Sequence, residues 1–315
     1  MAELFTFGET MAAFAPDREG PLRYAGNFQP YAAGSESNVA VGAAKLGVDT
    51  EWFSRLGMDE FGYFIRGKLL AEGVKCGHLL LDSEHPTGIM FKGISGGETK
   101  VFYYRKDSAA STMCPSDLDG LELEGVRVVY LTGITPVLSE SCRKTVEAMF
   151  DLAESRNITV AFDPNIREKL WHGKDHTEIL RRFALRSGIV LTGLDEGREI
   201  LGVQTVEEIV QTVFQKGRAE YLVIKDGARG AVVSDGSQTI KIPPYPCTPI
   251  ETIGAGDGFN AGFLSGIIKG ADLEKAAIMG SICGAMATQT RGDYEGYPDA
   301  EEMRTALEGR REPAR

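Results

Sequence analysis

Three glycines and a carboxylate lie together late in the sequence, in the segment 251–259, which reads Glu-Thr-Ile-Gly-Ala-Gly-Asp-Gly-Phe. Apolar residues follow at helical spacing, as in Phe259, Phe263 and Ile267, so the pattern predicts a helix that begins at the glycines. The first N–H groups of a helix have no acceptor inside it and form a site for anions, most often phosphate. Asp257 lies in the same turn, where a carboxylate can accept a proton. The segment therefore predicts phosphoryl transfer to a hydroxyl group.

This segment resembles the C-terminal signature of the ribokinase-like (PfkB) sugar kinases, which has the form Asp-Thr-Thr/Val-Gly-Ala-Gly-Asp. Glu251 and Ile253 replace two of its positions, and the last four are intact. The resemblance implies that Asp257 is the general base, and we expect its carboxylate to be ionised at neutral pH beside the helix N-terminus. The N–H groups that would stabilise the developing charge are those of Gly254, Ala255 and Gly256. The alternative is a glycine-rich turn in which Asp257 only caps its helix.

A second motif, at 33–38, reads Ala-Gly-Ser-Glu-Ser-Asn and precedes a helical run of small residues at 39–46. It resembles the family's N-terminal signature, Gly-Gly-x-x-x-Asn, with Ala in place of the first glycine. The substrate-binding residues that this resemblance implies are Gly34, Ser35 and Asn38. The glycine would let sugar hydroxyls approach the backbone, and the Asn38 amide would hydrogen-bond the sugar. The alternative is a Ser/Asn cap on a tightly packed helix.

A tyrosine and an arginine point to the same side of a predicted strand in the segment 101–112, because side chains alternate along a strand. These are Tyr103 and Arg105. A phenol beside a guanidinium suits a polyol that carries a carboxylate. The segment resembles the lid of the 2-keto-3-deoxygluconate kinases, a branch of the same family. As a lid residue outside the main core, Arg105 should contribute little to stability. The alternative is an exposed strand with an aromatic/cation pair.

The segment 162–171 matches the Asp-Pro-Asn-x-Arg-x-x-Leu-Trp motif of the same branch throughout. The resemblance places Asn165 and Arg167 at the cofactor, and Arg167 would bridge the acid group of the sugar and the transferring phosphate. The alternative is a turn stabilised by Asp and Pro. Near the C-terminus, the run that begins Gly-Asp at 292 resembles the ending Gly-Asp-x-x-Gly-Leu-Pro, which implies that Asp293 reaches the substrate or supports Asp257.

The ATP site is implied by two further resemblances. The run 225–230, Lys-Asp-Gly-Ala-Arg-Gly, resembles the family's nucleotide loop, whose glycines let the chain pass close to ATP. The resemblance implies that Lys225, Gly227 and Gly230 contact ATP, together with Gly254 and Gly256. Glu196 fits the acidic end of the family's Asn-x-x-Glu element, which helps to place Mg²⁺. Dependence on a monovalent cation stays open.

Short β-rich runs alternate with helical ones and supply the elements that must position these residues. Strands are predicted at 126–131, 158–162, 189–191 and 221–224, and a helix at 139–156. Such alternation predicts a mostly parallel sheet with helices on both faces, whose ligands bind beyond the C-terminal ends of the strands. Segments 11–33 and 87–108 depart from this alternation of strands and helices. The second reads as a hairpin with its turn at Gly96-Gly97, so the two predict a small β-sheet lid inserted into a single α/β domain over 1–315.

The bulk composition excludes several classes of protein. The chain has 315 residues, 43% of them hydrophobic and 25% charged, as in soluble globular proteins. Its net charge of −11 argues against nucleic acid and against docking on anionic membranes. The five cysteines are scattered, with no metal or disulfide pattern, and no signal peptide or apolar span is apparent, so we expect a cytoplasmic protein. The family resemblance implies a homo-oligomer, a dimer or larger.

All the motifs occur in family order, from Phe7-Gly8-Glu9 to Pro298. They predict a ribokinase-like fold and ATP-dependent phosphorylation of 2-dehydro-3-deoxy-D-gluconate on its 6-hydroxyl. One alternative is a family kinase for a neutral sugar such as fructose or ribose, although such a sugar has no carboxylate to pair with two arginines. Another is a non-catalytic sugar or nucleotide sensor, against which the intact Asp257 argues. Tolerance for the C4 epimer, 2-dehydro-3-deoxygalactonate, stays open.

Overall fold

A sheet of eight strands forms the centre of the molecule in a computed structural model that describes residues 2–95, 98–171 and 173–309. From one edge to the other the strands are β14 (Thr239–Ile242), β13 (Ala231–Ser234), β12 (Tyr221–Lys225), β11 (Ile189–Gly193), β10 (Thr159–Asp163), β9 (Val128–Thr132), β1 (Leu4–Phe7) and β4 (Thr50–Phe53). Only β13 runs antiparallel to its neighbours, and the other pairings are parallel. The predicted strands and the mostly parallel sheet are confirmed.

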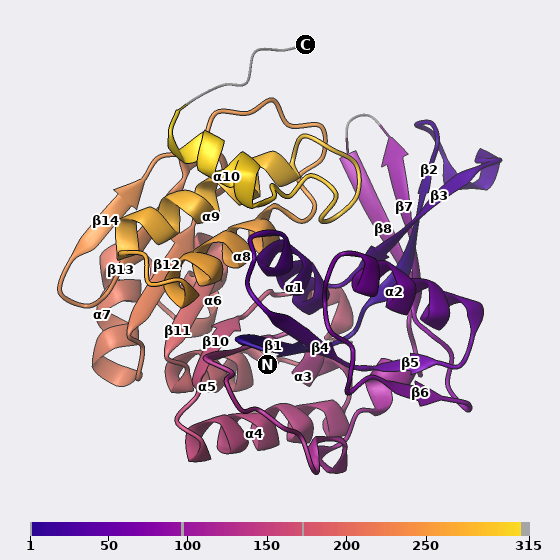
Figure 1. The fold of residues 1–315 in the computed structure, drawn as a ribbon, viewed down its shortest axis with the longest axis horizontal. Coiled ribbons are helices and arrows are strands. Elements are labelled where there is room, and N and C mark those ends of the chain that lie inside the picture. The colour runs from indigo at the N-terminus through magenta and orange to yellow at the C-terminus, as the bar shows by residue number, and fades with distance from the viewer. Residues whose placement is uncertain (1, 96–97, 172, 310–315) are drawn as a thin grey trace.

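Helices cover both faces of this sheet (Figure 1). One face is covered by α1 (Ser35–Lys45), α8 (Ala255–Ile268) and α9 (Leu273–Ala287), with α10 (Ala300–Leu307) outside them. The other is covered by α3 (Thr135–Leu138), α4 (Glu140–Ser155), α5 (Thr177–Arg186), α6 (Leu194–Leu201) and α7 (Val206–Lys216). Successive strand residues serve opposite cores: Leu4 packs with the α8 layer and Phe5 with the α4 layer, because side chains alternate along a strand.

The local sequence explains why these helices form. In α4 the hydroxyl of Ser139 caps the first turn by accepting from the N–H of Cys142 at 3.0 Å. Val146, Met149 and Phe150 are buried at spacings of three and four, so one apolar stripe faces the sheet. The structure thus confirms the helix predicted at 139–156.

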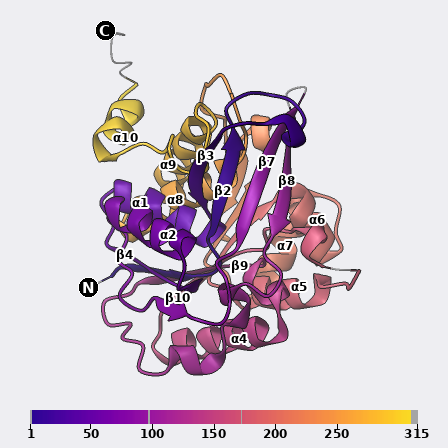
Figure 2. The same ribbon diagram turned by 90° about the vertical axis from the view of Figure 1, so that its right-hand side faces the viewer.

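A second sheet of four strands stands beside the C-terminal ends of the main sheet (Figure 2). We call it the small sheet, and its strands in order are β3 (Phe28–Ala33), β2 (Met11–Pro16), β7 (Ile89–Ser95) and β8 (Glu98–Tyr104). The predicted hairpin is β7–β8, while its turn at 96–97 lies outside the described residues. Helix α2 (Glu60–Ala71) packs against β2 and β3, and a two-stranded sheet pairs β5 (Arg55–Gly57) with β6 (Leu80–Asp82).

The parallel strands bring several polar residues to one end of the molecule. Asp163 ends β10, Gly193 ends β11 and Lys225 ends β12. Helices α1 and α8 begin at the same end, so their first turns face the ends of the strands and the small sheet. None of the described helices is both long enough and apolar enough to span a bilayer.

Candidate active site

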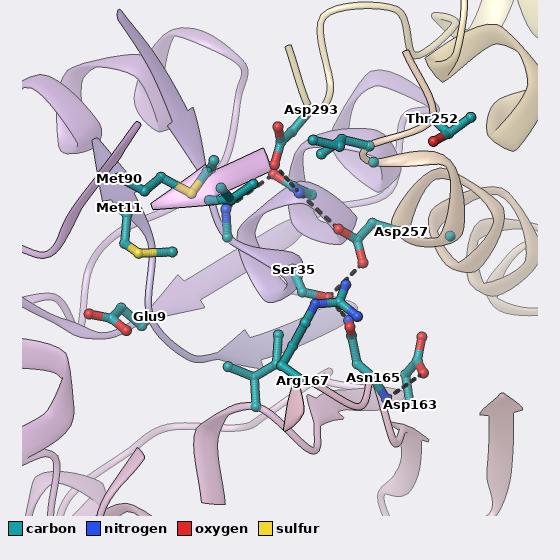
Figure 3. A pocket seen from close by; sticks show the side chains of 18 of the residues that line it. Glu9, Met11, Ser35, Met90, Asp163, Asn165, Arg167, Thr252, Asp257 and Asp293 are labelled. Atoms are coloured by element: carbon teal, nitrogen blue, oxygen red, sulfur yellow. Dashed lines mark hydrogen bonds between the residues drawn. The ribbon is translucent and has the colours of Figure 1, made fainter. Parts of the chain in front are cut away.

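A cavity of about 590 Å³ lies between the C-terminal ends of the main sheet and the inner side of the small sheet (Figure 3). Nearly all the residues singled out in the sequence line it: Gly34, Ser35, Asn38, Tyr103, Arg105, Asn165, Arg167, Glu196, Lys225, Gly227, Gly254, Gly256, Asp257 and Asp293. Ala255 lies between two lining glycines, and Gly230 lies further off, packed against the backbone of Ile242. Residues from distant parts of the chain therefore share one cavity, and the individual roles predicted for them stay predictions.

Asp257 is held in the first turn of α8 by two donors from α1. Its Oδ1 accepts from the Ser35 hydroxyl at 2.6 Å and its Oδ2 from the Asn38 amide at 2.8 Å (Figure 3). Burial raises the pKa of Asp257 to about 6, although the hydrogen bonds from Ser35 and Asn38 lower it. We expected the helix N-terminus to have the largest effect on the pKa of Asp257, whereas burial has the largest effect. The carboxylate is still mostly ionised at neutral pH, and a base with a pKa near the working pH is suited to proton transfer.

The turn before α8 depends on a glycine at position 254. Gly254 has φ of 81°, a left-handed conformation that glycine adopts readily, and a Cβ there would overlap the carbonyl oxygen of Asp293. Helix α8 begins at the next residue, and its first N–H groups have no acceptor within the helix, although that of Ala255 donates to the carbonyl of Thr252 at 3.4 Å. This N-terminus lies where the glycine pattern predicted an anion site, and that role stays a prediction.

A lysine places positive charge beside that turn. The Lys225 ammonium lies 2.6 Å from Asp163 Oδ2 and donates to the side chain of Asn260 at 3.1 Å. Asn260 in turn donates to Asp163 at 2.6 Å and to the Tyr130 hydroxyl at 3.1 Å. A Cβ at Gly256 would lie 3.8 Å from the ammonium, so a larger side chain there would fill the space between Lys225 and the turn. The lysine is therefore fixed beside the turn that precedes α8.

Asn165 and Glu196 lie at the same end of the sheet but have different partners. Asn165, with φ of 40°, donates its side-chain amide to Ser35 at 2.8 Å, and its buried Oδ1 has no hydrogen-bond partner in the described chain. Glu196 accepts from the backbone N–H groups of Ile166 at 2.8 Å and Gly193 at 2.9 Å. Burial raises the pKa of Glu196, as does the negative charge of Asp163. Glu196 therefore accepts hydrogen bonds from two backbone N–H groups, and its role in placing Mg²⁺ stays a prediction.

Within 2–95, 98–171 and 173–309, no cluster of three or more His, Cys, Asp or Glu side chains is placed to hold a metal ion. Magnesium in nucleotide sites is commonly held by substrate phosphates, waters and one or two protein oxygens, so it needs no such cluster. The unpartnered Asn165 oxygen is of the right chemical type. The residues present thus fit a magnesium ion that arrives with a nucleotide.

The two predicted substrate arginines have unlike surroundings. Arg105 is nearly buried and forms an ion pair with Glu9, to which its Nε donates at 2.6 Å. Ser108 donates to the other oxygen of Glu9 at 2.6 Å. Arg167 is exposed, donates to the carbonyl of Ile166 at 3.0 Å, and lowers the pKa of Asp257 by its charge. Of the two arginines, one is thus fixed by an ion pair and the other is exposed.

The pairing of Arg105 with Glu9 corrects one expectation. We expected Arg105 to matter little for stability, but the Glu9 side chain is only 1% exposed and would lose its cationic partner. Removing one member of a buried ion pair leaves an uncompensated charge, which is strongly destabilising. Sequence reasoning missed the pair because its two members are 96 residues apart.

Two further buried charged residues were not predicted. Lys92 on β7 lies behind the cavity, in contact with Asp293 at 2.8 Å and Glu251 at 3.5 Å. Glu36 in α1 accepts from the hydroxyls of Thr132 and Thr135, and burial raises its pKa to about 7. A signal was available for Lys92, a charged residue inside the apolar run 89–94, but not for Glu36, which lies in the polar run Gly-Ser-Glu-Ser-Asn at 34–38.

Comparison with known proteins agrees with this arrangement. The family model described as pfkB family carbohydrate kinase matches residues 1–300. The chain is 34% identical to a 2-dehydro-3-deoxygluconokinase of Bacillus subtilis (97% of this chain, 95% of the relative). It is 30% identical to a 2-dehydro-3-deoxygalactonokinase of Haloferax volcanii (93% and 92%). A crystal structure of a PfkB protein from Polaromonas sp. JS666 superposes with a TM-score of 0.87 at 35% identity, covering 96% of this chain and 99% of that one.

Proposed function

The chain belongs to the pfkB family of carbohydrate kinases, and on that premise we propose that it phosphorylates 2-dehydro-3-deoxy-D-gluconate on the 6-hydroxyl with ATP. One observation carries the proposal. The carboxylate of Asp257, held by two donors at a helix N-terminus, lines the same cavity as Arg105 and Arg167. An anion site with a base suits phosphoryl transfer, and two arginines suit an acceptor that carries a carboxylate.

In the proposed reaction the 6-hydroxyl oxygen attacks the γ-phosphorus of ATP while the bond from that phosphorus to the ADP oxygen breaks. The hydroxyl proton passes to Asp257, which then carries it as the neutral acid. The N–H groups at the start of α8 and the Lys225 ammonium stabilise the negative charge on the transferring phosphoryl group. In such a loose transition state the protein contributes mainly position and electrostatics.

Bound magnesium would neutralise charge on the ATP phosphates and hold them in one geometry. Asn165 would hold the ion with its unpartnered oxygen, and Glu196, whose two oxygens each accept from one backbone N–H group, would attract it by its negative charge. A monovalent-cation requirement has no supporting observation here and stays open.

The small sheet would act as the lid over the sugar. Tyr103 and Arg105 project from it toward the cavity, and the arginine lies 5.6 Å from the centre of the tyrosine ring.

The outer side of β8 exposes Phe102 (47%) and Tyr104 (64%). Exposed aromatic residues on a flat sheet are typical of protein interfaces, which supports the proposal that two copies associate through this side. All five cysteines are unpaired in the described chain, as in a reducing cytoplasm.

The assignment is tested by incubating the protein with ATP, Mg²⁺ and one sugar at a time, and by identifying the product with ³¹P and ¹³C NMR. The proposal expects ADP and a phosphate ester on C6 of the sugar acid. A product only from fructose or ribose would establish the neutral-sugar alternative. Binding of a sugar or of ATP with no turnover of any sugar would establish a non-catalytic sensor. The galactonate epimer belongs in the panel because a relative that acts on it is 30% identical.

A further inference from the structure

Lys92 is a fully buried lysine at the middle of β7, a strand of the small sheet. Its ammonium lies 2.8 Å from Asp293 Oδ1 and 3.5 Å from Glu251 Oε2, and 5.9 Å from the centre of the Tyr31 ring. Burial alone would lower the pKa of Lys92, but Asp293 and Glu251 raise it above its usual value. The ammonium is therefore charged, and it joins the small sheet to two loops of the main body.

Asp293 links this ion pair, through Asn38, to the carboxylate of Asp257. Its Oδ1 faces Lys92, and its Oδ2 accepts from the Asn38 amide at 3.3 Å. The same amide nitrogen donates to Asp257 Oδ2 at 2.8 Å. An amide nitrogen carries two N–H groups, so Asn38 supplies one to each carboxylate and its orientation is set by both. Figure 3 shows Asp293 and Asp257 on the same side of the cavity.

The charge of Lys92 matters for this arrangement because Asp293 and Asp257 share the orientation of one amide, which lies 2.8 Å from Asp257 and 3.3 Å from Asp293. With Lys92 present, Asp293 has a cation on one oxygen and needs little from Asn38. Without it, Asp293 is a buried carboxylate with only the amide as its partner, and such a group draws in the nearest donor. The amide would then turn from Asp257 toward Asp293, and Asp257 would lose one of the two bonds that orient it.

We propose that Lys92 is a positioning residue for phosphoryl transfer, which acts through Asp293 and Asn38 to hold the Asp257 carboxylate in place. The inference rests on the proposed function, in which Asp257 is the base. The competing explanation is that Lys92 only stabilises the packing of β7 against the main body. A buried ion pair is often no more stable than apolar residues of the same volume, so stability alone is a weak reason to bury this lysine.

The first experiment replaces Lys92 by methionine, which keeps the length and removes the charge. Lys100→Met is the matched control, because Lys100 is an exposed lysine on the neighbouring strand β8. Steady-state kinetics on folded protein, checked by circular dichroism, should show kcat lowered about 10²-fold in Lys92→Met, the scale of a small misplacement of a reacting group. The KM for ATP should not change, and Lys100→Met should behave as wild type. A lowered Tm with normal kcat would show that Lys92 only stabilises the fold and would overturn the inference.

The second experiment is a double-mutant cycle with Asp293→Asn. The asparagine no longer carries the charge that Lys92 neutralises, so Lys92→Met should cost much less kcat in the Asp293→Asn background than in wild type. Effects that simply multiply would show that the two residues act independently and would overturn the inference. The cycle is repeated in a Glu251→Gln background to cover the case in which Lys92→Met fails to fold, because the triple variant then buries neither of the carboxylates that Lys92 neutralises and can be compared with Glu251→Gln/Asp293→Asn.

A third measurement does not depend on the identity of the sugar. Crystal structures of wild type and Lys92→Met, without substrate, report directly where the Asn38 amide points. The inference expects it to leave Asp257 in the variant, and an unchanged contact between Asn38 and Asp257 would overturn it. If wild type phosphorylates no sugar acid, the proposed function fails, while this structural comparison still decides the role of Lys92.

Discussion

The turn before α8 and the small sheet line the same cavity but hold their charged side chains differently. Around the turn, Asp163 and Lys225 come from the ends of nearby parallel strands and contact each other at 2.6 Å. On the small sheet, Arg105 and Lys92 are each paired with carboxylates that lie elsewhere in the chain. In the proposed reaction the first region would provide donors and a base at the reacting atoms. The second provides buried ion pairs that fix the wall of the cavity.

This difference predicts how the two regions respond to substitution. A change at Asp257 should alter catalysis and leave the fold intact, because its carboxylate is held by hydrogen bonds from the neutral side chains of Ser35 and Asn38. A change in the small sheet should alter binding and stability together, because each cation also neutralises a buried carboxylate. The predictions below test this division.

The largest effect is expected at Asp257. Asp257→Asn removes the base but leaves the backbone N–H groups at the start of α8, so kcat should fall about 10²–10⁴-fold. The KM for ATP should hardly move. The measurement is steady-state kinetics with the sugar acid. Asn is nearly as good a helix cap as Asp, so an Asp257→Asn enzyme with near wild-type kcat would reduce this residue to a cap.

Arg105→Ala should affect binding and stability at once. Loss of a charge-assisted contact should raise the KM for the sugar acid by an amount equivalent to about 1.5–3 kcal/mol. Loss of the partner of buried Glu9 should lower the free energy of unfolding by about 3–5 kcal/mol. Chemical denaturation and kinetics measure the two effects.

The double variant Glu9→Gln/Arg105→Ala is the control for Arg105→Ala. It removes the unpaired charge, so it should recover stability without recovering the KM. If Arg105→Ala leaves both KM and stability unchanged, the arginine is only a surface cation and the small sheet does not select the acid.

The pH dependence should report Asp257. Its pKa is raised from 3.8 to about 6, so the base is protonated below that pH. At saturating Mg²⁺ and ATP, kcat/KM for the sugar should fall about tenfold per pH unit below 6, as expected for a single essential base. A profile that is flat between pH 5 and pH 7 would be incompatible with this assignment.

The same shift has a consequence for stability. A carboxyl group whose pKa is raised by folding contributes stability below its unfolded pKa, and this contribution is lost as the pH rises through the folded pKa. Wild type should therefore lose stability relative to Asp257→Asn as the pH rises from about 4 to about 6. Denaturation midpoints of both proteins across this range measure the effect, and a constant difference would contradict it.

The smallest effect is expected at the rim of the small sheet. The hydroxyl of Thr99 donates to Glu251 at 3.2 Å and is partly exposed. Thr99→Val should cost about 0.5–1.5 kcal/mol of stability, the usual net value of one hydrogen bond, with kcat unchanged. A large loss of kcat would show that Glu251, and not only Asp293, controls the catalytic geometry.

The same two regions differ in how far the sequence predicts them. The strands that end at Asp163 and Lys225 could be predicted because each is a short apolar run followed by a polar residue, and parallel strands bring such ends together. The α8 turn could be predicted because glycines precede an apolar pattern with helical spacing, and the structure shows that the left-handed backbone at 254 and its close approach to residue 293 require glycine there. The predicted α/β fold with a small second sheet is confirmed.

The ion pairs of the small sheet could not be predicted because they depend on tertiary pairing. Parallel pairing of β2 with β7, and antiparallel pairing of β7 with β8, brings Glu9 beside Arg105. Lys92 and Asp293 are 201 residues apart, and no local pattern links them. A charged residue in an apolar strand indicates that a partner must exist, but it does not identify that partner.

We propose that this cavity combines a phosphoryl-transfer turn with a wall that selects a sugar acid. It is tested most directly by the ratio of kcat/KM for 2-dehydro-3-deoxy-D-gluconate to kcat/KM for fructose with the wild-type protein. The account predicts a ratio of about 10² or more, since each arginine contact to a carboxylate contributes about 1.5–3 kcal/mol that a neutral sugar cannot use. A ratio near one would contradict it, because the two arginines would then bind nothing that distinguishes the acid.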